Sequence, residues 1–165
     1  MISLKEIKNS IFSKENFYFL IIILLTFSID RYSKIKIINN FSDTRFYLND
    51  FLNLDLLWNT GIGFGLLSLE SSIYYNFLSI LIGLVIVLLI FVGIKSNKFE
   101  KFFFSMIIGG ALGNFYDRIY FNAVPDFIDL HYKNFHWFTF NIADIFITIG
   151  IIFYIFNGVL INRSK

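Results

Sequence analysis

The stretch IYYNFLSILIGLVIVLLIFVGI, residues 73–94, carries no charged side chain along its whole length. A helix needs about 20 apolar residues to cross the roughly 30 Å hydrocarbon layer of a bilayer, and this stretch is long enough. The rest of the chain has a similar composition, because 56% of the 165 residues are hydrophobic, 21% are aromatic and only 16% are charged. A soluble domain of this size cannot bury so much apolar surface, so the sequence predicts a membrane protein.

Three further apolar segments lie before and after residues 73–94. Residues 140–161 and 102–121 are interrupted by only a few polar positions, and the shorter run at 17–29 needs flanking residues to reach across a bilayer. This first run lacks a small-x-small cleavage site after it, so we expect a retained helix rather than a signal peptide. The sequence thus predicts one membrane-embedded domain over residues 1–165, with spans near 14–34, 73–94, 102–121 and 140–161 and outer loops near 35–72 and 122–139.

Basic residues predict how the spans are oriented. They cluster in the N-terminal segment, in the loop between the second and third spans and in the C-terminal tail, as Lys5, Lys8, Lys14, Lys95, Lys98, Lys101, Arg163 and Lys165. Short loops rich in Lys and Arg stay in the cytoplasm, so both termini are expected there. Arg31, Lys34 and Lys36 argue against this orientation, but they receive less weight because Asp30 lies on the same helix.

Several functional classes are excluded by composition and by missing motifs. The chain has no Cys and only two His, so disulfides, thiolate metal sites and a cysteine nucleophile are not expected. A net charge of +2 is too small to indicate nucleic-acid binding. The sequence also lacks a zinc-protease His-Glu-x-x-His pair, a Gly-x-Ser-x-Gly elbow and a P-loop.

Ionisable side chains within apolar spans are costly and are functional candidates by default. Asp30 and Lys34 share one face of the first span, where an ion pair that ends the span is an equally simple interpretation. Asn114 and Arg118 share a face near the end of the third span, with Asp117 one position away. Arg118 has the paired donors needed to hold a carboxylate, although an arginine that extends to the membrane surface is a strong alternative.

Two glycine-containing segments lie near these polar positions. The segment Asn59-Thr60-Gly61-Ile62-Gly63-Phe64-Gly65 has glycines at alternate positions, which suits either a backbone that binds an extended peptide or an ordinary turn. Gly109 and Gly113 form a small-xxx-small face in the third span, for which close helix packing is the favoured interpretation.

Three aspartates lie in the predicted outer loop at 122–139 or shortly after it. Asp126 follows Pro125, the only proline of the chain, whose ring stiffens the backbone, and Asp129 is a competitor that spacing does not separate from it. Asp144 and Asn141 together resemble a capping box at the start of the fourth span, and a cap is the favoured interpretation of these residues alone.

Carboxylates gathered at one face of a membrane suggest amide hydrolysis. An ionised carboxylate takes a proton from a shared water while a protonated one polarises the carbonyl group. One alternative is a small multi-span transporter or proton-conducting protein with Asp30, Asp117 and Asp144 as a relay, although residues 73–94 contain no carboxylate. Another alternative is an assembly protein whose helices pair through Gly109 and Gly113.

Five short motifs resemble, in their order along the chain, those of lipoprotein signal peptidase (signal peptidase II), the bacterial aspartic peptidase family A8. Each motif is weak alone, but the ordered set covers most of the chain and is specific. The motifs are Asp30-Arg31-Tyr32-Ser33-Lys34, Asn59-Thr60-Gly61-Ile62-Gly63-Phe64, Gly109-Gly110-Ala111-Leu112-Gly113-Asn114-Phe115-Tyr116-Asp117-Arg118, Val124-Pro125-Asp126-Phe127 and Phe140-Asn141-Ile142-Ala143-Asp144.

The resemblance implies an all-α integral membrane fold of four transmembrane helices, with a small extracytoplasmic β cradle and a short surface helix supplied by the outer loops. It also implies that Asp126 and Asp144 are the catalytic dyad, which ranks Asp126 above Asp129 and gives Asp144 a role beyond a cap. The residues implied to line or support the site are Asn59, Gly61, Asn114, Arg118, Asn141, Asp30, Lys34 and Asp117.

The substrate implied by the resemblance is a prolipoprotein whose lipobox Cys already carries diacylglycerol and which is cut just before that Cys. We therefore expect a monomer in the bacterial inner membrane, with its active site at the outer face and no cofactor, metal or nucleic-acid partner. Its expected partners are the lipidated precursor and membrane lipid. The chain departs from the family pattern at Ile62 and Gly63, where two alanines are usual, and at Pro125, where an aliphatic residue is more common. Neither departure alters a carboxylate, so we expect an active enzyme.

Overall fold

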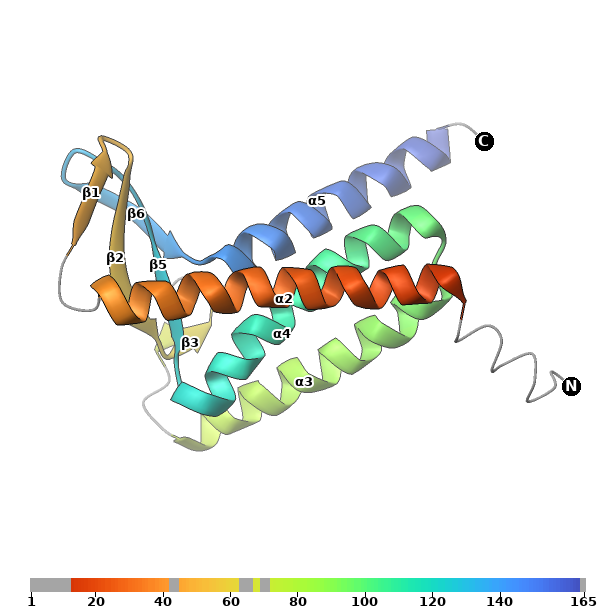
Figure 1. The fold of residues 1–165 in the computed structure, drawn as a ribbon, viewed down its shortest axis with the longest axis horizontal. Coiled ribbons are helices and arrows are strands. Elements are labelled where there is room, and N and C mark those ends of the chain that lie inside the picture. The colour runs from red at the N-terminus through yellow and green to blue at the C-terminus, as the bar shows by residue number, and fades with distance from the viewer. Residues whose placement is uncertain (1–12, 42–44, 63–66, 69–71, 164–165) are drawn as a thin grey trace, which may run out of the picture.

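The computed structural model describes residues 13–41, 45–62, 67–68 and 72–163. Four long helices lie side by side, and a small β-sheet extends from one end of the bundle (Figure 1). The helices are α2 (Lys14–Phe41), α3 (Ser72–Lys95), α4 (Lys98–Phe121) and α5 (Ile142–Arg163). The predicted spans 14–34, 73–94 and 102–121 lie within α2, α3 and α4, and the predicted span 140–161 corresponds to α5, which begins two residues later.

Helix α4 is the central element and packs against each of the other three helices. Its glycines permit this close approach. A Cβ atom at Gly109 would lie 2.6 Å from the Cβ of Thr26 on α2, and one at Gly110 would lie 2.6 Å from the carbonyl oxygen of Ala143 on α5. Gly113 contacts Asp30 of α2 in the same way. The packing role predicted for Gly109 and Gly113 is therefore confirmed.

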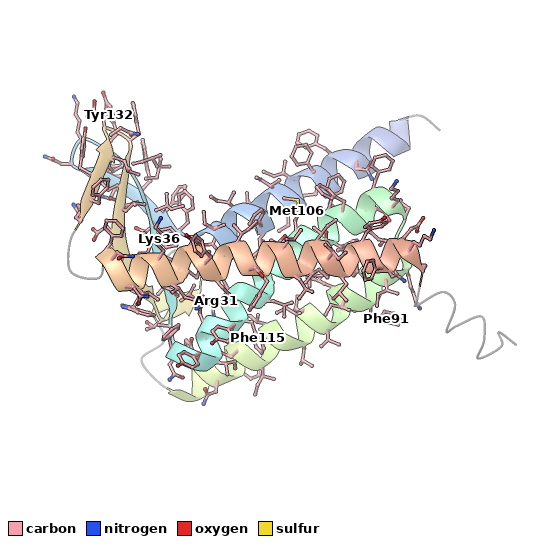
Figure 2. All side chains as sticks on the ribbon, viewed as in Figure 1. Arg31, Lys36, Phe91, Met106, Phe115 and Tyr132 are labelled. Atoms are coloured by element: carbon pink, nitrogen blue, oxygen red, sulfur yellow. The ribbon has the colours of Figure 1, made fainter. Side chains whose placement is uncertain are left out.

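The outer faces of the helices are strongly apolar. Ile80, Leu84, Val87 and Phe91 on α3 are all exposed, and Figure 2 shows Phe91 on the outside of the bundle. An apolar surface of this extent indicates contact with a membrane or a partner rather than with water. The buried core lies between α2, α3 and α4, where Phe19, Ile23, Ile86, Phe104 and Ile108 pack together.

Length and composition mark one described helix, Tyr75–Lys95, as able to cross a membrane, and Ile142–Gly158 is apolar but shorter. Helices α2 and α4 carry several charged residues, which lower their hydropathy. The first of these helices also differs from its predicted bounds. It continues to Phe41, so residues 35–41 are helical and do not belong to an outer loop. The polar positions near residue 34 do not end the helix, because Asp30 and Lys34 are buried inside the bundle.

The four-stranded antiparallel sheet has the order β1-β2-β5-β6. Its strands are β1 (Phe46–Asn49), β2 (Leu52–Asn59), β5 (Val124–Tyr132) and β6 (Phe135–Phe140), and a separate hairpin joins β3 (Gly61–Ile62) to β4 (Leu67–Ser68). The two predicted outer loops thus form one sheet, as the resemblance implied. The short surface helix is not found in the part of the chain that the structure describes, and loop residues 42–44, 63–66 and 69–71 lie outside it.

The pairing of β2 with β5 determines which polar residues meet at the junction of sheet and bundle. Leu57 pairs with Asp126 and Asn59 pairs with Val124, so the end of β2 lies beside the start of β5. Strand β6 then leads directly into α5 at the same junction (Figure 1). The start of α2, the connection from α3 to α4 and the end of α5 lie at the opposite end of the molecule.

Candidate active site

Asp126 lies near the start of β5, directly after the fully buried Pro125. Its side chain is only 2% exposed and accepts two hydrogen bonds. The Nδ2 group of Asn59 donates to one carboxylate oxygen at 2.9 Å, and the Nδ2 group of Asn141 donates to the other at 2.6 Å. The carboxylate is thus held rigidly between the end of β2 and the start of α5.

Asp144 lies in the first turn of α5 and forms a capping box with Asn141. The backbone N–H of Asp144 donates to Oδ1 of Asn141 at 3.1 Å, and the backbone N–H of Asn141 donates to Oδ2 of Asp144 at 3.1 Å. The predicted cap is therefore present. The remaining oxygen of Asp144 accepts a 2.8 Å hydrogen bond from Nδ2 of Asn114 on α4.

Asn141 connects the two carboxylates, because it hydrogen-bonds Asp126 through its side chain and Asp144 through its backbone. Burial raises the pKa of Asp126 to about 6, and the negative charge of the nearby Asp144 also raises it. The amide donors of Asn59 and Asn141 lower the pKa of Asp126, but these effects are smaller than that of burial. Two acidic groups with this arrangement share a proton more readily than isolated aspartates do.

A buried cluster of four charged side chains lies between α2 and α4. Lys34 is fully buried, with its Nζ atom 2.8 Å from Asp30 and 2.7 Å from Asp117. Arg31 forms an ion pair with Asp117 and lies over the ring of Tyr116 at 4.6 Å. The cluster contains two positive and two negative groups, so its charges balance.

This cluster reaches the candidate site through Asn114 and through Asp30. Lys34 Nζ donates to Oδ1 of Asn114 at 2.7 Å, and Asn114 in turn donates to Asp144. Asp30 accepts a 2.9 Å hydrogen bond from the backbone N–H of Ala143, in the first turn of α5. The pair of Asp30 and Lys34 therefore does not terminate a span but connects α2 to the start of α5.

Arg118 contacts backbone rather than a carboxylate. Its Nη2 group donates to the carbonyl oxygen of Gly61 at 3.1 Å and its Nη1 group to that of Asn114 at 3.4 Å. The hypothesis that Arg118 holds a carboxylate is therefore wrong for the described residues. Its side chain is almost fully buried, which also argues against an arginine at the membrane surface. Instead, Arg118 holds the backbone at Gly61, two positions after Asn59.

Asp129 is separate from these groups, although it lies on the same strand as Asp126. It is bound by His136 on β6 at 2.8 Å and by Nδ2 of Asn53 on β2 at 3.3 Å. Asn53 and Asp129 are also partners in the strand register. The structure thus places Asp126, and not Asp129, beside Asn141 and the start of α5.

The structure brings nearly all of the predicted site residues together. One chain of hydrogen bonds runs from Asn59 through Asp126, Asn141 and Asp144 to Asn114, and Lys34, Asp30 and Asp117 form the cluster behind it. Arg31 is the member that sequence reasoning missed, since it was considered only as a signal of orientation. Its position in the Asp-Arg-Tyr-Ser-Lys motif, beside two other charged residues in an apolar segment, was the available signal. No three His, Asp or Glu side chains of the described ranges form a group able to hold a metal ion.

An apolar cavity of about 210 Å³ opens beside Asp144. Its walls come from the end of β6 and the first three turns of α5, and its lining residues are Phe138, Phe140, Asp144, Ile145, Thr148 and Ile149. The Asp144 carboxyl group therefore lies between a polar network and an apolar space. A mostly apolar cavity with a few polar groups at its edge is typical of a ligand-binding site.

Comparisons with known proteins identify the family of this chain. The family profile described as "Signal peptidase (SPase) II" matches residues 22–160. The lipoprotein signal peptidase of Pelagibacter ubique (strain HTCC1062) is 50% identical over 155 residues, which cover 92% of this chain and 93% of that protein. The lipoprotein signal peptidase of Francisella tularensis subsp. novicida (strain U112) is 42% identical over 109 residues, covering 64% of this chain and 68% of that protein.

Solved structures show the same fold. A bacterial membrane enzyme determined by the in meso method at 2.3 Å resolution superposes with a TM-score of 0.71 at 31% identity. The match covers 89% of this chain and 90% of that one. A second bacterial membrane enzyme, determined at 1.9 Å by the same method, superposes with a TM-score of 0.70 at 30% identity. The protein described here is therefore a membrane peptidase that belongs to the signal peptidase II family.

Proposed function

We propose that this protein is an aspartic endopeptidase that removes signal peptides from diacylglyceryl-modified prolipoproteins, cutting just before the lipidated Cys. The observation that carries the proposal is the bridge formed by Asn141, which holds Asp126 and Asp144 at one site. The family and the names of the relatives support the substrate class. The dyad and the position of the cut are inferred from the paired carboxylates.

The proposed reaction uses the two carboxyl groups in different protonation states. We assign the shared proton to Asp126, because burial and the charge of Asp144 raise its pKa from the ordinary value of 3.8 to about 6. Asp144 takes a proton from a water molecule, whose oxygen attacks the carbonyl carbon of the residue before the lipidated Cys, while Asp126 donates its proton to the carbonyl oxygen. The tetrahedral intermediate then collapses: Asp144 gives the proton that it took from water to the leaving Cys nitrogen, the C–N bond breaks, and a hydroxyl proton of the intermediate returns to Asp126. The new carboxylic acid group releases its proton to solvent. The products are a signal peptide with a new carboxylate and a lipoprotein with a free N-terminal Cys.

The surroundings of the carboxylates suit a substrate that is held by lipid. Asp144 borders the apolar cavity of about 210 Å³, and the helices below it have exposed apolar faces. An acyl-anchored Cys would present its peptide bond at this depth without leaving the membrane. Arg118 and Gly61 form the side of the site next to Asn59, where the substrate backbone is proposed to bind.

We also propose that all four long helices cross the bacterial inner membrane, with both termini in the cytoplasm and the site at the outer face. The sheet lies at one end of the bundle, and the connection between α3 and α4, which holds Lys95 and Lys98, lies at the other (Figure 1). Lys14 begins α2 at that same end. Basic residues collected at one end match the positive-inside rule. A monomer is proposed because the site is formed within one chain.

The contacts of Asp30, Asp117 and Asp144 support a proton relay less well than they support hydrolysis. Asp30 and Asp117 are both in ion pairs with Lys34 or Arg31, so neither is free to exchange protons at low energetic cost. Asp144 lies beyond this cluster and is separated from it by Asn114. We therefore retain the peptidase as the proposal.

Cleavage of a purified precursor tests this function. The detergent-purified protein is incubated with a prolipoprotein that has been diacylglycerylated at its lipobox Cys, and with the same precursor without lipid. We expect a shift to smaller size for the lipidated precursor only, with the new N-terminus at the modified Cys as measured by mass spectrometry. An intact lipidated precursor, or a cut at another bond, would contradict the proposal.

A further inference from the structure

Three asparagines surround the two proposed catalytic carboxylates, and each can present either of two opposite groups to them. An Asn side chain ends in a carbonyl oxygen, which accepts, and an NH2 group, which donates. Rotation by half a turn exchanges the two groups. A carboxyl oxygen that accepts a hydrogen bond needs the NH2 group, so each of these three contacts forms only when the amide is held in the correct orientation.

Two of these amides are held by backbone N–H groups. The N–H of Gly61 donates to Oδ1 of Asn59 at 2.9 Å, which turns the NH2 group of Asn59 toward Asp126. The N–H of Asp144 donates to Oδ1 of Asn141 at 3.1 Å, which turns the NH2 group of Asn141 toward Asp126 as well. The orientations of Asn59 and Asn141 are therefore set by backbone groups and not by other side chains.

The third amide, that of Asn114, is held by a side chain. Lys34 Nζ lies 2.7 Å from Oδ1 of Asn114, and Nδ2 of Asn114 lies 2.8 Å from Asp144. A lysine ammonium has three donors and no acceptor, so it tolerates only the oxygen of the amide. Half a turn of Asn114 would bring NH2 against the ammonium and oxygen against the carboxylate, and both contacts are repulsive.

Lys34 is itself held in place although it does not reach the reacting atoms. Its side chain is fully buried, and the carboxylates of Asp30 and Asp117 lie 2.8 and 2.7 Å from its Nζ atom. Arg31 balances the second negative charge of this cluster. The ammonium group therefore has little freedom to move away from Asn114.

We propose that Lys34 is a positioning residue that locks the side-chain amide of Asn114 with its NH2 group toward Asp144, and so keeps Asp144 ready to accept a proton from water. The inference rests on the proposed function for its effect on rate, but the lock itself is a property of the folded protein. In this way the buried charged cluster of Asp30, Lys34 and Asp117 controls the hydrogen bond between Asn114 and Asp144.

Removal of Lys34 alone would leave a buried negative charge, so the test uses a charge-balanced change. Lys34→Met is combined with Asp30→Asn, which keeps an oxygen for the backbone N–H of Ala143 and leaves the pair of Arg31 and Asp117 intact. Lys36→Met is the matched control, because Lys36 lies two positions further along α2 and is exposed (Figure 2). Membrane extraction and apparent melting temperature are measured for every variant.

A double-mutant cycle with Asn114→Ala separates a lock from a general structural role. We expect the Lys34→Met and Asp30→Asn change to lower kcat by about 10- to 100-fold with little effect on KM, and to shift the acidic limb of the pH–rate profile to higher pH. In the Asn114→Ala background the same change should lower kcat by less than about twofold, because the group that it acts on is gone. If the Lys34→Met and Asp30→Asn change lowers kcat by the same factor in the Asn114→Ala background as in the wild type, the proposed lock is wrong.

A second readout does not depend on activity. In protein labelled with ¹⁵N at asparagine, the side-chain signals of Asn114 are identified by their loss in Asn114→Ala. We expect the Lys34→Met and Asp30→Asn change to shift these signals and speed their exchange with water, while Lys36→Met leaves them unchanged. Unchanged Asn114 signals would overturn the lock. A wild-type protein that cleaves no lipidated precursor would instead overturn the proposed function, and the spectra would still decide the orientation of Asn114.

Discussion

Asn141 lies with its side-chain amide 2.6 Å from the carboxylate of Asp126, although the two residues are 15 positions apart in the chain. The rest of β5 and the antiparallel strand β6 fill that interval, and the pairing of Phe140 with Ile128 returns the chain to a position near the start of β5. The same Asn141 begins α5 and caps it through Asp144. One residue thus joins the sheet, the helix bundle and both acidic groups.

Asp126→Asn and Asp144→Asn should each lower cleavage of the lipidated precursor by at least about 10³-fold, because either change removes a group that must exchange a proton. Both variants should insert in membranes at wild-type levels. Asp129→Asn is the matched control on the same strand, since Asp129 faces His136 and Asn53 instead. Comparable loss of cleavage in Asp129→Asn, or undiminished cleavage in either other variant, would refute the dyad.

The pKa of Asp126 should fall when Asp144 is replaced by Asn. In the wild-type protein, burial and the charge of Asp144 together raise this pKa to about 6. Loss of the neighbouring negative charge favours the ionised form of Asp126, so its pKa should decrease but remain above the ordinary value of 3.8 because burial persists. Carboxyl ¹³C chemical shifts followed against pH measure this directly. A pKa that stays the same or rises in the variant would show that the two groups do not interact.

The helices could be predicted from the sequence because their signal is local. Long apolar runs appear at residues 73–94 and 140–161. Helix α3 extends the first by one residue at each end, and helix α5 is displaced from the second by two residues. The end of α2 could not be predicted in this way. Asp30 and Lys34 suggest a membrane boundary in a linear sequence. In the fold they pair with each other, Lys34 also pairs with Asp117, and the helix continues to Phe41.

The site itself depends on contacts that no local pattern contains. Lys34 and Asn114 are 80 positions apart, and Asn59 and Asp126 are 67 positions apart. The spacing of Asp126 and Asp129 gave no reason to prefer one of them, and the register of β2 against β5 is what places Asp126 beside Asn59. The capping box at Asn141 and Asp144 was visible locally, but its link to Asp126 was not.

Lys101→Met should destabilise the fold. In the sequence alone, Lys101 indicates only the orientation of the spans. Its buried ammonium donates to the carbonyl oxygens of Gly93 and Ile94, in the last turn of α3, and of Ser96, just after that helix. The Gly93 oxygen also accepts a 3.2 Å hydrogen bond from the backbone N–H of Ser96. Loss of the bonds from Lys101 should lower stability by about 1–3 kcal/mol, since buried carbonyl groups are left unpaired. Thermal unfolding in detergent measures the effect. Lys98→Met, an exposed change three positions earlier, is the control, and equal effects of both changes would contradict the assigned cap.

Gly110→Ala tests how closely α4 must approach α5 for the site to form. The added Cβ would lie 2.6 Å from the carbonyl oxygen of Ala143, a backbone atom that cannot move without displacing the start of α5. We expect a loss of about 1–3 kcal/mol in stability. Activity should fall as well, because Asp144 follows Ala143 directly and its bond to Asn114 spans the same two helices. Gly158→Ala is the matched control, since no atom lies within 4 Å of its added Cβ and alanine favours a helix. If Gly110→Ala retained wild-type melting and cleavage, the close approach of α4 to α5 would not be what aligns Asn114 with Asp144.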